Sequence, residues 1–134
     1  MMKTFNVTSL GCPKNLVDSE VMYGVLEEHG WSGVDNPEDA ALLLVNTCGF
    51  IQPAVEESIE EILQLLTYKQ ANPSIKIVVT GCLVQRYRHK LETELPEVDL
   101  FLGTEGVAEI NRYVDGMMTG GKAERVILPD RFLM

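Results

Sequence analysis

The three cysteines, Cys12, Cys48 and Cys82, are the residues of this chain most suited to chemistry. Each directly follows a strand-like run and precedes a segment with helical periodicity. The separations, 12 to 48 and 48 to 82, are too long for a zinc finger or a CxxC redox pair. A shared site would require the fold to bring three distant loops together. The alternative is that the cysteines are buried apolar residues, although three at equivalent junctions argue against this.

Strand-like and helix-like segments alternate about five times along the chain. This alternation predicts an α/β fold with three layers, in which helices cover both faces of a mostly parallel sheet of about five strands, as in flavodoxin-like or Rossmann-like proteins. In the order 2-1-3-4-5, the strands before the three cysteines would be neighbours and would end on the same side. The expected strands are residues 4–10, 31–34, 41–45, 75–80 and 98–102, and the expected helices are residues 15–30, 53–66, 83–95 and 107–117.

The residues around the cysteines suit a bound group. Gly11, Gly49 and Gly81 permit unusual backbone dihedrals and close approach to a bulky cofactor. Asn15 and Asn46 are near enough in the sequence to donate hydrogen bonds to cluster sulfurs. The alternative role of both asparagines is to cap helices or turns.

Three thiolates suit zinc or an iron–sulfur cluster. A structural zinc site needs a fourth ligand, and both histidines, His29 and His89, fall within or at the end of expected helices, away from these loops. This favours a cubane cluster with one iron that lacks a protein thiolate. A three-iron cluster with all sites filled is the alternative.

Composition excludes several classes of protein. With 134 residues, of which 46% are hydrophobic and 23% charged, the chain is typical of one globular domain. It contains neither an apolar run that approaches the roughly 20 residues of a membrane span nor the apolar core of a signal peptide, so we expect a cytoplasmic protein without membrane contact. Reduced thiols, not disulfides, are expected there. The net charge of −9 disfavours direct nucleic acid binding and suits either a basic partner or simple solubility.

Three motifs, in this order, resemble the N-terminal domain of the radical-SAM methylthiotransferases. They are GCPKNLVDSE at residues 11–20, LLVNTCGFI at 43–51 with AVEES following, and IVVTGCL at 77–83. The likeness covers about residues 5–110. The segment PKNL at 13–16 looks like the RimO branch, which modifies an aspartate of the twelfth small-subunit ribosomal protein. The MiaB branch, which acts on tRNA adenosines, usually has Gln-Met-Asn after the first cysteine.

The resemblance implies that Cys12, Cys48 and Cys82 hold an auxiliary 4Fe-4S cluster that takes part in sulfur insertion. It also implies a longer transferase with a second 4Fe-4S cluster and S-adenosylmethionine, bound by a CxxxCxxC motif that this sequence does not contain. We therefore expect residues 1–118 to form the cluster-binding domain and residues 119–134 to form a linker toward a radical-SAM domain in cis.

The resemblance further implies that the substrate is the ribosomal protein. It does not indicate the sulfur donor, and this fragment alone is expected to be inactive. Two alternative functions stay open at this point. One is the same domain of a tRNA adenosine methylthiotransferase, and the other is a non-catalytic flavodoxin-like interaction module with structural cysteines.

Overall fold

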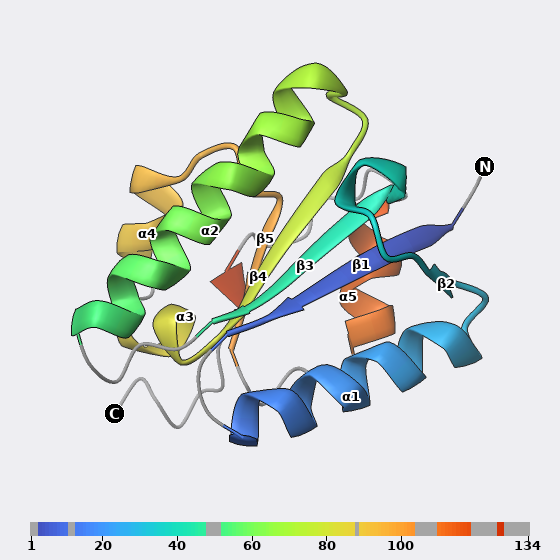
Figure 1. Ribbon diagram of the computed structural model, residues 1–134, viewed down its shortest axis with the longest axis horizontal. Coiled ribbons are helices and arrows are strands. Elements are labelled where there is room, and N and C mark those ends of the chain that lie inside the picture. The colour runs from blue at the N-terminus through green and yellow to red at the C-terminus, as the bar shows by residue number, and fades with distance from the viewer. Residues whose placement is uncertain are drawn as a thin grey trace.

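The computed structural model of the chain describes residues 3–10, 13–47, 52–87, 89–103, 110–118 and 126–127. The described residues form one sheet in the strand order β2-β1-β3-β4-β5-β6, and every strand pair in it is parallel (Figure 1). The strands are β1 (Thr4–Ser9), β2 (Ser32–Gly33), β3 (Leu42–Thr47), β4 (Lys76–Gly81), β5 (Leu100–Leu102) and β6 (Val126–Ile127). The helices are α1 (Pro13–Glu28), α2 (Gln52–Ala71), α3 (Cys82–Tyr87), α4 (His89–Glu94) and α5 (Ile110–Met118), with a short 3₁₀ turn at Pro37–Asp39.

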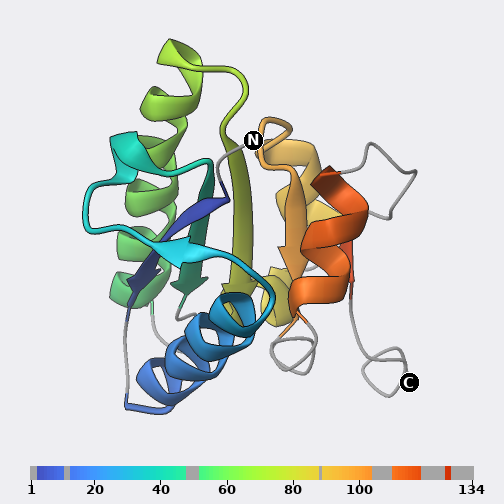
Figure 2. The same cartoon turned by 90° about the vertical axis from the view of Figure 1, so that its right-hand side faces the viewer.

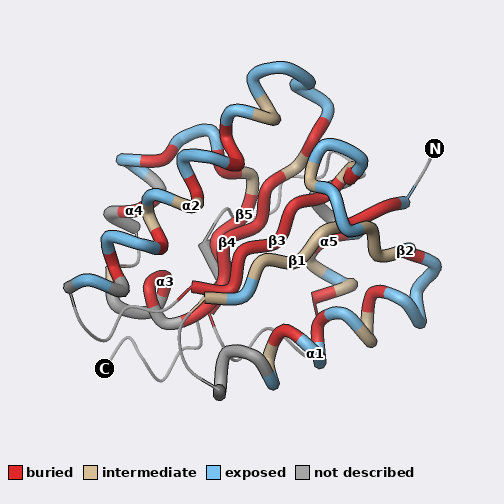
Figure 3. Tube along the Cα trace, in the orientation of Figure 1, coloured by how far each residue is buried: buried red, intermediate tan, exposed pale blue. Residues whose placement is uncertain are grey.

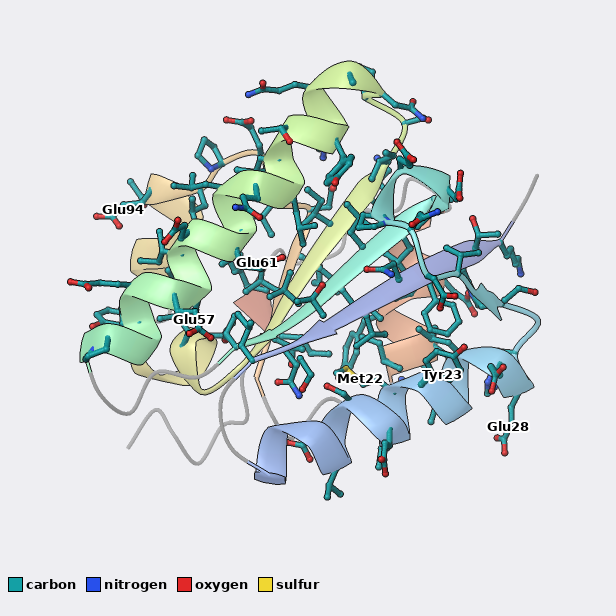
Figure 4. The ribbon with its side chains drawn as sticks, in the orientation of Figure 1. Met22, Tyr23, Glu28, Glu57, Glu61 and Glu94 are labelled. Carbon is teal, nitrogen blue, oxygen red and sulfur yellow. The ribbon has the colours of Figure 1, made fainter. Side chains whose placement is uncertain are left out.

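Helices cover both faces of the sheet, so the molecule has three layers (Figure 2). Side chains of β3 alternate between two separate cores: Leu43 and Val45 pack on the side of α2, α3 and α4, whereas Leu42 and Leu44 pack on the side of α1 and α5. Met22 points from α1 toward the sheet and is fully buried (Figure 4). Burial on both faces explains why the central strands read as continuous apolar runs. Figure 3 shows β3 and β4 buried along almost their whole length.

The predicted fold class is confirmed. The first five strands lie in the order 2-1-3-4-5, the order in which the strands before the three cysteines were expected to be neighbours, although the sequence alone did not fix it. Helix α1 begins two residues earlier than expected, at Pro13, a residue type that suits the first turn of a helix. The helix expected at residues 83–95 corresponds to α3 and α4, and residue 88 between them lies outside the described residues.

The sixth strand was not predicted. β6 pairs in parallel with β5, with Val126 opposite Phe101 and Ile127 opposite Leu102. These two residues lie in the segment that the sequence analysis assigned to a linker. A strand of two residues is too short to show the alternation from which strands are predicted. None of the helices in the described ranges has the length and apolar character of a membrane span.

A polar network ties α2 to the amino ends of β4 and β5. Asp99 Oδ2 accepts hydrogen bonds from the Ile77 backbone N–H at 2.9 Å and from Lys69 Nζ at 2.5 Å. Lys69 Nζ also donates to the Glu97 carbonyl at 2.9 Å, and Lys76 Nζ lies 3.9 Å from Asp99 Oδ1. The Lys69 and Asp99 side chains are less than one-fifth exposed, at 19% and 18%. Because these side chains are partly buried, we expect the network to stabilise the fold more than an exposed ion pair would.

We expect Asp99→Ala to lower the free energy of unfolding by about 1 to 3 kcal/mol, because it leaves the Ile77 backbone N–H without its side-chain acceptor and Lys69 without its carboxylate partner. Urea unfolding followed by circular dichroism measures this loss. Glu94→Ala is the control, since Glu94 is exposed and points away from the sheet (Figure 4), and its effect should stay within about 0.5 kcal/mol. Equal unfolding free energies for the two variants would contradict a stabilising role for the Asp99 network.

Candidate metal centre

The candidate site is the edge of the sheet where β1, β3 and β4 end, which we call the carboxyl edge. Ser9, Asn46 and Thr80 occupy one row across these three strands. In the next row, Thr47 lies opposite Gly81. The three strands are direct neighbours and end within one row of one another (Figure 1). Residues that follow them in the sequence therefore start from the same edge.

The predicted ligands follow these three strand ends. Cys82 directly follows Gly81 and is the first residue of α3, but its side chain is outside what the structure describes. Cys12 and Cys48 lie outside the described residues; Cys48 directly follows Thr47 in the sequence. The structure thus brings the strands before the cysteines together, and ligation by the sulfurs stays a prediction. Within the described ranges, which omit two of the three cysteines, no three His, Cys, Asp or Glu residues gather into a metal site.

Buried polar residues concentrate at the carboxyl edge. Asn46, Thr47 and Thr80 are all fully buried and occupy the last rows of β3 and β4. The remaining residues of these two strands that face the cores are aliphatic. Burying polar groups costs free energy unless they are hydrogen-bonded, so such a concentration marks a place with a specific role. The buried polar residues of the described part of the chain are Thr4, Ser19, Asn46, Thr47, Ser58 and Thr80.

Asn46 connects the sheet to α1. Its Nδ2 donates a buried hydrogen bond of 3.1 Å to Ser19 Oγ. This bond holds α1, the helix that begins directly after Cys12, against the end of β3. Asn15 lies in α1 one helical turn before Ser19, and its side chain is outside the described residues. The predicted hydrogen bonds from Asn15 and Asn46 to cluster sulfurs stay predictions, although one amide proton of Asn46 is used by Ser19.

Thr47 connects β3 to β4. Its Oγ1 donates a hydrogen bond of 2.6 Å to the Thr80 carbonyl, and both residues are fully buried. The bond adds a side-chain link between the two strands just before Cys48 and Cys82 in the sequence. It therefore limits how far the two strand ends can separate.

Gly81 is required where β4 turns into α3. Its φ of +104° lies in the region that residues with a side chain rarely adopt. A Cβ atom there would stand 2.7 Å from Asn46 Oδ1 and 2.8 Å from the Thr47 backbone nitrogen, and it would also collide with the Thr47 carbonyl oxygen. The predicted unusual dihedral is confirmed for Gly81, while Gly11 and Gly49 lie outside the described residues.

Three residues at this edge were not predicted from the sequence as parts of the site: Ser19, Thr47 and Thr80. A signal was present for two of them, since Thr47 and Thr80 stand at the end of strand-like runs and are the threonines of the TC motif at residues 47–48 and the TGC motif at residues 80–82. Ser19 offered no signal, because its role depends on how α1 packs against β3.

We expect Gly81→Ala to lower the free energy of unfolding by about 2 to 5 kcal/mol, since it combines backbone strain with a collision against β3. Gly24→Ala is the matched control. Gly24 lies inside α1 with no atom within 4 Å of its added Cβ, so alanine should stabilise the chain by about 0.4 to 1 kcal/mol. Denaturant titration of both variants measures the difference, and similar unfolding free energies would contradict the account of the β4–α3 turn.

Comparison with known protein sequences agrees with the resemblance that the motifs indicate. The model of a family described as uncharacterized protein family UPF0004 matches residues 4–103. The ribosomal protein uS12 methylthiotransferase RimO of Desulfotalea psychrophila (strain LSv54 / DSM 12343) is 60% identical over 130 residues, which are 97% of this chain and 29% of that protein. The protein of the same name from Syntrophus aciditrophicus (strain SB) is 49% identical over 132 residues, which are 96% of this chain and 29% of the relative.

The chain spans less than a third of the length of these two curated relatives. The predicted resemblance to methylthiotransferases is confirmed by the names of the relatives. Since the family match covers about three-quarters of the sequence, from the first strand to the end of β5, the chain belongs to the UPF0004 family.

Proposed function

We propose that this chain is the cluster-binding domain of a ribosomal-protein methylthiotransferase, in which Cys12, Cys48 and Cys82 hold an auxiliary 4Fe-4S cluster. The observation that carries the proposal is that β1, β3 and β4, the three neighbouring strands that precede these cysteines, end within one row of one another. Identities of 60% and 49% to proteins named uS12 methylthiotransferase support the activity of the longer protein.

The arrangement fits a small cluster bound by sulfur. Adjacent strands of a sheet are about 4.8 Å apart, so the outer two of three are about 10 Å apart, and short loops can bring three sulfurs together over that distance. Thiolates are the preferred ligands of iron–sulfur clusters. Buried polar side chains line the same edge, where a hydrogen-bonding environment for an anionic group is needed.

The chain's own residues would hold and orient the cluster. When bound, the cluster supplies an iron without a protein thiolate, to which an external sulfur species or substrate could bind. The Ser19–Asn46 and Thr47–Thr80 hydrogen bonds fix α1, β3 and β4 relative to one another, and so fix the places from which the three loops start. Asn15 and Asn46 would donate to cluster sulfurs.

The proposed domain spans residues 1–118, and residues 119–134 would lead toward a radical-SAM domain in cis, with β6 adding to the domain's sheet. The second 4Fe-4S cluster and S-adenosylmethionine would belong to that domain. The 134 residues alone would therefore have no turnover. We propose a cytoplasmic location, where ribosomal proteins are modified.

The proposed substrate is the twelfth small-subunit ribosomal protein. Ribosomal proteins are basic, and a domain with a net charge of −9 suits a basic protein better than a phosphate backbone. Analysis of the product of the longer enzyme tests this: a thiomethylated ribosomal protein is expected, and a methylthioadenosine in tRNA would contradict it.

Anaerobic reconstitution of the chain with iron and sulfide should give about four irons per chain and a brown absorbance at about 400 nm. Cys48→Ser should lose both, because one of three ligands is gone. Ser9→Ala, an exposed change at the same edge, should retain both and serves as the control. A colourless protein that folds normally after this treatment would contradict the cluster proposal and favour an interaction module with structural cysteines.

A further inference from the structure

Thr80 carries a buried hydroxyl at the carboxyl edge of the sheet. The residue is fully buried, and Oγ1 has no hydrogen-bond partner among the residues that the structure describes. The backbone of Thr80 is engaged, since its carbonyl accepts the hydrogen bond from Thr47 Oγ1. A buried hydroxyl without a partner loses its hydrogen bonds to water and gains nothing in return. Such groups are rare in folded proteins and call for an explanation.

The other two buried threonines of the described residues show the usual arrangement. Thr47 Oγ1 donates to the Thr80 carbonyl at 2.6 Å. At the opposite end of the sheet, Thr4 Oγ1 donates to the Asp39 carbonyl at 3.1 Å and accepts from the Ala41 backbone N–H at 3.0 Å. Thr80 thus differs from Thr4 and Thr47, which are equally or almost equally buried.

Thr80 lies where the proposed cluster would be held. It is the second-last residue of β4, two residues before Cys82, and it stands opposite Asn46 across the β3–β4 pair. Side chains alternate along β4, and Val78 packs in the core on the side of α1. Thr80 therefore belongs to the same face as Val78, the face on which Asn46 contacts Ser19 of α1.

We propose that the Thr80 hydroxyl donates a hydrogen bond to a sulfur of the group held at the carboxyl edge, either a cysteine thiolate or an inorganic sulfide. This inference rests on the proposed function. The ligand class is an anionic iron–sulfur group, because a hydroxyl that donates into a buried site suits an acceptor with negative charge. The hydroxyl also satisfies its own hydrogen-bonding need only when that group is bound.

Such a hydrogen bond has a measurable consequence. Reduction of a cluster adds an electron, so the reduced state carries more negative charge on its sulfurs. A donor to sulfur stabilises that state more than the oxidised state and raises the reduction potential. Removal of the Thr80 hydroxyl should therefore make the cluster harder to reduce.

The test compares Thr80→Val, which keeps the shape and removes the hydroxyl, with Thr80→Ser, which keeps the hydroxyl. The 134-residue chain and both variants are reconstituted anaerobically with iron and sulfide and titrated with dithionite in the presence of redox mediators. Electron paramagnetic resonance of the reduced cluster gives the potential. Thermal unfolding of the cluster-free chains is measured in parallel.

We expect Thr80→Val to lower the equilibrium constant for reduction by about two- to tenfold, where tenfold equals 59 mV for a one-electron couple. Thr80→Ser should stay within about twofold of the unchanged chain. The cluster-free Thr80→Val chain should unfold at the same or a higher temperature, because no bond within the described fold is lost. A Thr80→Val chain that fails to retain iron while Thr80→Ser retains it would also support the proposal.

Thr4→Val is a control with the converse expected effects. It removes a hydroxyl that makes two hydrogen bonds at the far end of the sheet, so it should lower the unfolding temperature and leave the potential unchanged. An unchanged potential in Thr80→Val would overturn the inference and leave the proposed function standing. A lowered unfolding temperature of the cluster-free Thr80→Val chain would overturn it too, by showing a partner within the fold. If the chain without substitutions takes up no iron, both this inference and the proposed function are wrong.

Discussion

Three neighbouring parallel strands end within one row of one another, and the rest of the molecule depends on this constraint. Because β1, β3 and β4 run in the same direction and in register, the loops that follow them begin at one edge. Residues more than thirty positions apart in the sequence can therefore contribute to one site at this edge. A metal centre built in this way needs no local ligand motif, because the sheet brings the ligands together, as a short CxxC turn does in a zinc finger.

The two ends of the sheet have different chemistry. Apolar side chains fill both cores along the middle of β3 and β4, and they supply most of the stabilisation. The carboxyl edge instead carries buried amide and hydroxyl groups, which contribute less to stability and more to the exact placement of α1, β3 and β4. At the amino edge, the Lys69–Asp99 pair holds α2 against β4 and β5. The contacts that stabilise the fold therefore lie mostly away from the carboxyl edge, where we propose that the cluster binds.

Most of the fold could be predicted from the sequence, and only part of the site. Long apolar runs such as residues 41–45 and the glycine at 81 have local signatures, so the strands and the turn before Cys82 were recognisable. The two-residue β6 has no periodicity. The Asn46–Ser19 bond joins residues that are 27 positions apart. The burial of the Thr80 hydroxyl away from any partner among the described residues depends on packing between strands, which no local pattern encodes.

The central proposal is that the thiols of three cysteines, which follow three neighbouring strands, bind one inorganic group. Anomalous diffraction at the iron edge, from crystals of the anaerobically reconstituted chain, tests it most directly. We expect one compact group of iron peaks at the carboxyl edge, bonded to the sulfurs of Cys12, Cys48 and Cys82. Iron bound elsewhere, or these sulfurs packed separately among aliphatic side chains, would contradict it.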